Sequence, residues 1–407
     1  MSADQPHTEP GPAVASITLD DLLGDLLWTK LLAASRLALG PGRMGIAVAA
    51  VVGILLLDAV ASWILGGPTL AETARQAMGD ALARSADGLA DGDPASVVSG
   101  FVGRVVDPFQ SASALTPWKF GFLIGPFFLI ALVGGGAISR MAACEFSLNQ
   151  AMSIRAGLSF SGRRLATMAG AVLGPLAVVG LLLVVLAAGG WLMLGLPIVN
   201  LIGSVLYGLA IVVGALAVVA LVAYGLGASM IVPAVVCEGT DAVDAVSRAY
   251  AMVFAGPVRL VLYLVVLVVQ GAVALLVLSL LAGAVVSLTA WVGSAWTGES
   301  VRQIIQTGSA GVLEQGPAGA GIGAGWLGFW IGLWSALPGA VVLAYLYSYC
   351  ACGSTLLYLV MRRIADGQGL GELWSPGQIE AAMQAALQAR EHAGPDAGPD
   401  AGSHKPR

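Results

Sequence analysis

Charged side chains are what this sequence has least of. They make up 11% of its 407 residues, whereas a soluble globular protein is about one-quarter charged. Hydrophobic residues make up 57%, and the mean hydropathy is +0.86. This balance excludes a soluble globular fold and predicts a polytopic membrane protein. The small net charge of −5 also argues against nucleic acid as a partner.

Side chains that carry out catalysis or bind metals are equally scarce. The three histidines, His7, His392 and His404, lie near the two ends of the chain and outside every apolar run. The sequence contains no G-x-S-x-G elbow, no Walker loop and no H-E-x-x-H motif. We therefore expect no catalytic residue, no metal site and no cofactor, and we do not expect an enzyme.

Apolar runs long enough to cross a bilayer, which takes about twenty residues, occur six times. The predicted fold class is therefore an all-α polytopic membrane helix bundle with six transmembrane helices. The predicted spans cover residues 45–65, 118–138, 167–190, 206–236, 258–286 and 326–361. The longest polar segment, residues 66–117, follows the first span and is expected to form an external loop.

An amphipathic segment precedes each pair of spans, and we call these three segments elbows: residues 18–43, 144–164 and 237–259. Ser147 and Asp241 are expected to cap the helices of the second and third elbows. A glycine ends each elbow and permits a bend, a proline after two of the glycines favours a new helix start, and an arginine follows that is expected to reach lipid phosphate. These junction residues are Gly40, Pro41 and Arg43; Gly162 and Arg164; and Gly256, Pro257 and Arg259.

The elbows divide the chain into three predicted repeats of an interfacial helix and two spans, at residues 17–144, 145–237 and 238–363. Residues 1–16 are expected to be a disordered tail, and residues 364–407 a cytoplasmic helix followed by a disordered tail. Chance similarity among Ala-, Val- and Leu-rich segments is the competing explanation for the repeat.

The distribution of positive charge predicts the orientation in the membrane. Six spans place both termini on one side, and most of the 19 Lys and Arg residues lie in the terminal segments and in the second and third elbows. Both termini are therefore expected in the cytoplasm. The four cysteines, Cys144, Cys237, Cys350 and Cys352, then lie near cytoplasmic helix ends, where packing is a better explanation than disulfides.

Polar groups within or beside the spans are the candidate functional residues. Asp58 lies in the outer half of the first span, with no obvious Lys or Arg partner in the other spans. Gln270, near the middle of the fifth span, could form a hydrogen bond to another helix. Interfacial ion pairs are expected for two glutamates at the inner boundary, with elbow arginines as partners: Glu145 and Glu238, with Arg140, Arg155 or Arg248.

The end of the last span resembles the closing segment of a poorly characterised family of bacterial six-span integral membrane proteins, familiar from planctomycete-type bacteria and of unknown function. The resemblance implies the six-span fold and the bacterial inner membrane as location, and it implies no activity. It rests on about thirty residues, YLYSYCACGSTLLYLVMRRIADGQGLGEL, and within them on Tyr347, Ser348, Ser354, Thr355, Tyr358, Arg362, Arg363, Asp366, Gly367 and Glu372.

The sequence thus favours a structural or accessory component of a membrane assembly. Its expected partners are the lipid bilayer, other membrane proteins or further copies of the same chain in a homo-oligomer. The alternative is a small-molecule or lipid transporter whose pathway runs near Asp58.

Overall fold

The computed structural model describes residues 27–66, 117–194, 199–309 and 322–374, together with scattered residues between 69 and 99. All regular secondary structure in these ranges is helical. The expected tail at 1–16, the first part of the 18–43 elbow, most of the 66–117 loop and the helix expected beyond residue 374 lie outside the described residues.

Six helices of the described chain are long and apolar enough to cross a membrane, which confirms the all-α polytopic class. Each predicted span lies almost wholly within one of them, and the observed helices are longer because they continue past the apolar runs into polar residues. They are α4 (Pro41–Leu65), α7 (Pro117–Leu148), α9 (Leu165–Leu194), α10 (Val199–Glu238), α12 (Pro257–Ser294) and α14 (Ile322–Asp366).

Short helices occupy the elbows and one connection. They are α2 (Leu27–Leu31) and α3 (Ala33–Ala38), then α8 (Ile154–Arg163), α11 (Ala242–Ala255) and, between α12 and α14, α13 (Glu299–Ser309). Gly40 is the N-cap of α4 and Gly256 separates α11 from α12, and in both cases a proline is the first residue of the following helix.

The caps of the two later elbows differ in how well the sequence predicted them. The side chain of Asp241 accepts the backbone N–H of Asp244 at 2.9 Å and starts α11, as expected. The predicted cap at Ser147 is wrong, because α7 continues to Leu148, and Ser153 caps α8 instead. Gly162 lies inside α8, so the junction with α9 falls two residues later than predicted, at Arg164.

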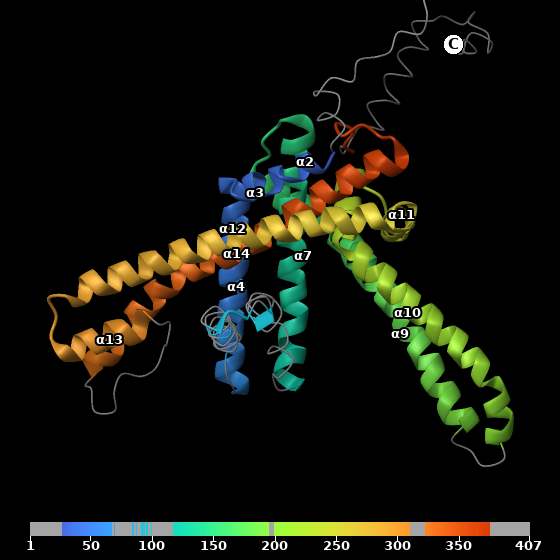
Figure 1. Ribbon diagram of the computed structural model, residues 1–407, viewed down its shortest axis with the longest axis horizontal. Coiled ribbons are helices and arrows are strands. Elements are labelled where there is room, and N and C mark those ends of the chain that lie inside the picture. Colours follow the sequence, from blue (N-terminus) through green and yellow to red (C-terminus); the bar gives the residue numbers. More distant parts are fainter. Residues whose placement is uncertain are drawn as a thin grey trace, which may run out of the picture.

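The long helices pair into three antiparallel hairpins, α4/α7, α9/α10 and α12/α14, which diverge from one shared end (Figure 1). In that view α9/α10 and α12/α14 point to opposite sides, with α4/α7 between them. The main hydrophobic core lies at the shared end, which we call the hub. It gathers side chains from every long helix, including Ile46, Ile138, Met168, Ile231, Leu260 and Tyr358.

Close helix contacts in the hub depend on two glycines that face tyrosines of α14. A Cβ atom on Gly134 would lie 2.6 Å from Tyr347 Oη, and one on Gly271 would lie 2.6 Å from the Tyr349 ring. The two hydroxyls donate to backbone carbonyls of α7 and α12, at 2.8 Å and 2.6 Å respectively. Because a buried hydroxyl needs an acceptor, these bonds fix α14 against both helices.

Candidate functional site: a carboxylate–arginine network in the hub

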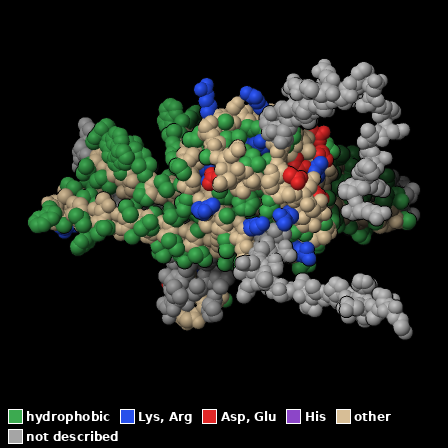
Figure 2. Space-filling view, turned by 90° about the horizontal axis from the view of Figure 1, so that it is seen from above, with side chains coloured by type: hydrophobic (Ala, Val, Ile, Leu, Met, Phe, Trp, Pro, Cys, Tyr) green, Lys and Arg blue, Asp and Glu red, His purple; other side chains and the backbone are tan. Residues whose placement is uncertain are grey.

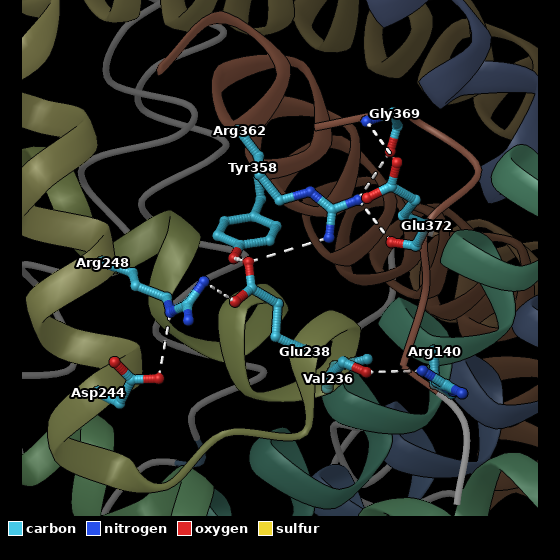
Figure 3. Close-up of polar contacts among 9 residues, drawn as sticks. All are labelled: Arg140, Val236, Glu238, Asp244, Arg248, Tyr358, Arg362, Gly369 and Glu372. Atoms are coloured by element: carbon cyan, nitrogen blue, oxygen red, sulfur yellow. Dashed lines mark hydrogen bonds and ion pairs between the residues drawn. The ribbon is translucent and has the colours of Figure 1, made fainter. Parts of the chain in front are cut away.

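Glu238, the last residue of α10, is the centre of the largest polar network in the described chain (Figure 3). Its side chain is 9% exposed. Tyr358 donates its hydroxyl to Oε1, Arg248 forms an ion pair with Oε2, and Arg362 Nη1 lies 3.9 Å from Oε1. One carboxylate therefore joins α10 to α11 and to α14.

Arg248 extends this network along α11. Its guanidinium also donates to Asp244 Oδ2 at 3.1 Å, one helical turn earlier. Burial alone would lower the pKa of Arg248, but the carboxylates of Glu238 and Asp244 outweigh burial and raise the pKa above its ordinary value. The Glu238–Arg248 pair is one of those anticipated from the sequence, and Arg248 stays charged at every accessible pH.

Two buried arginines hold the segment that follows α14, residues 367–374, which we call the strap. Arg362 is 2% exposed and donates to the carbonyls of Gly369 and Glu372, at 3.1 Å and 2.6 Å. Arg140 is 4% exposed and donates to the carbonyl of Trp374 at 2.7 Å. Charged donors on backbone carbonyls form strong hydrogen bonds, so the strap is fixed to the hub.

Trp374 is the last residue of the strap and contacts Cys237, Gly239 and Arg164. Its backbone N–H donates to the carbonyl of Cys237 at 2.9 Å. Its ring contacts Gly239, whose φ of +63° is a conformation that favours glycine. The guanidinium of Arg164 lies 4.9 Å from the ring centroid. Arg164 is therefore engaged with the strap and does not point freely to lipid.

A second ion pair, in which only the arginine is buried, corrects two expectations about the elbows. Arg43 is 3% exposed, and its Nη1 lies 2.7 Å from Glu145 Oε2, while its Nε donates to the carbonyl of Leu37. Arg43 therefore joins α4 to α7 and does not reach lipid phosphate. Glu145 is paired with Arg43 because the start of α4 packs beside the end of α7, and Arg155 is exposed, with no ion pair among the described residues.

Asp58 has a cationic partner, which the sequence did not suggest. Lys119 Nζ lies 3.5 Å from Asp58 Oδ1, and both side chains are 1% exposed. Lys119 also donates to Ser62 Oγ at 2.6 Å. Because α4 and α7 are antiparallel, the end of the first helix meets the start of the second, and the pair ties the hairpin together where the 66–117 loop leaves it.

Gln270 forms the interhelical hydrogen bonds that its place in α12 suggested. Its Nε2 donates to the carbonyl of Leu32 at 2.8 Å and to Ser35 Oγ at 2.9 Å. Leu32 is the residue between α2 and α3, where the helix is interrupted. Beside it lies an open groove of about 540 Å³ with a nearly apolar lining, and Asp58 is not part of it. The groove is lined by Leu32, Ser35, Val265, Val266, Val269, Gln270, Val273 and Ala274.

The sequence did not indicate Arg362 and Trp374 as members of the network, and Arg140, expected to pair with a glutamate, instead donates to the carbonyls of Val236 and Trp374. Tyr358 and Arg362 had been noticed only within the family resemblance, and a lone arginine near a helix end does not reveal which carbonyls it will meet. Within the described residues, no group of three or more His, Cys, Asp or Glu side chains is placed to hold a metal ion. No family model, curated protein or solved structure matches the chain, so the role of the network is inferred from its geometry.

Proposed function

We propose that this protein is a non-enzymatic structural or accessory component of a membrane assembly in the bacterial inner membrane. The observation that carries the proposal is that the charged side chains of the hub are paired with one another or with backbone carbonyls. The carboxylates of Glu145 and Glu238 bind arginines, and the buried arginines also bind backbone carbonyls. Such groups position helices rather than transform a substrate, and they leave three apolar hairpins to contact lipid or neighbouring proteins.

The proposed assembly is tested by purifying the tagged protein from its native membranes after mild chemical cross-linking. We expect one or more membrane proteins, or further copies of this chain, to be recovered in a fixed ratio. Recovery of a monodisperse single copy, both with and without cross-linking, would overturn the proposal. A tagged protein with an unrelated six-span fold serves as the control for non-specific recovery.

The proposed orientation places both termini in the cytoplasm and the 66–117 loop outside. Each of the three proposed repeats has this same orientation, with its elbow on the cytoplasmic side. Support comes from the positive charge near the elbows and from the short helices that precede each hairpin. A single cysteine at position 96, introduced as Ser96→Cys in a chain without other cysteines, should react with an impermeant maleimide in intact cells. Reaction only after the cells are opened would reverse the orientation.

A lipid or small-molecule transporter is the second candidate, and the buried Asp58–Lys119 pair is the observation that favours it. Ion pairs inside apolar spans often mark transport pathways. The test is dithionite quenching of NBD-labelled phosphatidylglycerol in proteoliposomes. Complete quenching with the wild-type chain and half quenching with Asp58→Asn would support transport, whereas half quenching with both excludes lipid transport by this protein.

A further inference from the structure

The outward face of α8 combines exposed cations with exposed apolar side chains. Ile154 and Leu158 are 44% and 37% exposed and lie one turn apart. Arg155 and Arg163 are also exposed; at about 100° per residue they lie about 80° apart, with Arg155 next to the apolar pair and Arg163 beyond it on the outward face. An apolar stripe beside a basic stripe is the pattern of a helix that lies in a membrane interface.

The arginines of the hub fall into two groups. Arg43, Arg140 and Arg362 are buried and bind carboxylates or carbonyls. Arg155 and Arg163 have no hydrogen bond or ion pair within the described residues and remain available to an anion. Within the part of the chain that the structure describes, their positive charge is therefore not used in any contact.

The third elbow is an internal comparison, because α11 holds the equivalent position with a different charge. Its exposed surface carries Asp241 and the 80% exposed Val243, and Asp244 beside them is already paired with Arg248. Seen from the hub end in Figure 2, acidic side chains gather on one side while Lys and Arg occur around the rest of the central body. Exposed arginines also occur on other elements, at Arg36, Arg259 and Arg363, and α8 differs in carrying two of them on one short helix together with exposed apolar side chains.

We propose that α8 binds the anionic headgroups of phospholipids, with Arg155 and Arg163 against the phosphates and with Ile154 and Leu158 inserted at the boundary of the acyl chains. Two facts select a lipid over free phosphate. The exposed apolar side chains favour an apolar neighbour, and α8 packs beside the end of α7 and the start of α4, two helices long and apolar enough to cross a membrane. The inference does not depend on the proposed assembly.

The test uses the purified full-length protein in detergent, titrated with phosphatidylglycerol or phosphatidylcholine, with bound lipids counted by native mass spectrometry. Wild type should bind phosphatidylglycerol more tightly than phosphatidylcholine. An arginine near an anionic surface contributes about 1 kcal/mol, so each substitution should weaken phosphatidylglycerol binding about fivefold. Arg155→Gln with Arg163→Gln should nearly abolish the preference between the two lipids.

Matched variants separate charge, folding and position. Arg155→Lys with Arg163→Lys keeps the charge and should keep the preference, while Leu158→Gln should weaken the binding of both lipids. Arg302→Gln removes a partly exposed arginine from α13, where Glu299 already neutralises it, and should change nothing. Gel filtration checks that each variant is folded, and the single Arg163→Gln replaces the double variant if that one aggregates.

Three results would overturn the proposal. The first is an unchanged lipid preference in a folded Arg163→Gln or double-glutamine variant. The second is an equal loss in Arg302→Gln, which would show a non-specific effect of net charge. The third is displacement of the lipid by millimolar inorganic phosphate, which would identify a site for a free anion.

Discussion

Replacing Glu238 with glutamine should loosen the hub more than any comparable change at an exposed ion pair. Glutamine has nearly the same shape, so it removes the negative charge while leaving an oxygen that can accept from Tyr358. The charge of Arg362, which is 2% exposed, then loses its only carboxylate among the described residues. The strap, which Arg362 holds through two carbonyls, should loosen with it.

The expected cost follows from the burial of each partner. Breaking a buried ion pair from one side costs about 3–5 kcal/mol, whereas an exposed pair contributes about 0–1 kcal/mol. Arg362 is buried, but its 3.9 Å separation and its carbonyl bonds reduce the loss, and Arg248 is 36% exposed and adds little. We therefore expect Glu238→Gln to destabilise the hub by about 3 kcal/mol.

Buried cysteines provide the assay. Cys144, Cys237 and Cys352 are buried and become reactive only when the hub opens, while Cys350 is exposed and is first replaced by serine. Labelling with a maleimide in detergent is followed residue by residue by mass spectrometry. A loss of about 3 kcal/mol raises the equilibrium constant for opening of the hub by about a hundredfold. Labelling of Cys237 should accelerate by about the same factor.

The control is Glu299→Gln, the same chemical change at the Glu299–Arg302 pair, whose side chains are 71% and 41% exposed. That variant should label within about twofold of the parent chain, since exposed pairs contribute little. If Glu238→Gln labels no faster than Glu299→Gln, the network does not hold the hub together, and the structural explanation of Glu238 fails.

Three further outcomes are expected from the same labelling assay and from limited proteolysis. Asp58→Asn or Lys119→Met alone should each destabilise the first hairpin by about 3–5 kcal/mol, because each removes the charged partner of the other group. The double variant Asp58→Asn with Lys119→Met should recover much of the loss, and additive losses would show that the two groups are not coupled. Gly271→Ala should cost about 1–3 kcal/mol because the new methyl group meets a tyrosine ring of α14, whereas Gly174→Ala, with open space around it, should be neutral, and equal effects would contradict the packing argument. Trp374→Ala removes the ring from Gly239 and Arg164 but keeps the backbone hydrogen bonds of the strap, so protease sensitivity should rise modestly and only at the end of the strap; unchanged cleavage would show that the ring adds nothing to these bonds.

Composition and periodicity were sufficient to predict the fold class and the location of every long helix. Membrane spans are easy to predict because a run of about twenty apolar residues forms few structures other than a membrane helix. Local chemistry likewise predicted Asp241 as a cap and Pro41 and Pro257 as helix starts, since these preferences act within one turn. The end of α7 was less predictable, because no residue near Ser147 stops the helix before Leu148.

The partners of the charged groups were decided only by the tertiary structure. Lys119 meets Asp58 because the hairpin is antiparallel, and Arg43 meets Glu145 because the start of α4 packs beside the end of α7. An arginine has several possible partners within reach of its long side chain, and burial selects among them, because a charge removed from water must find a countercharge or carbonyls. The sequence alone thus determined where the long helices of the described chain are, and their packing determined which arginines hold the hub and which remain exposed.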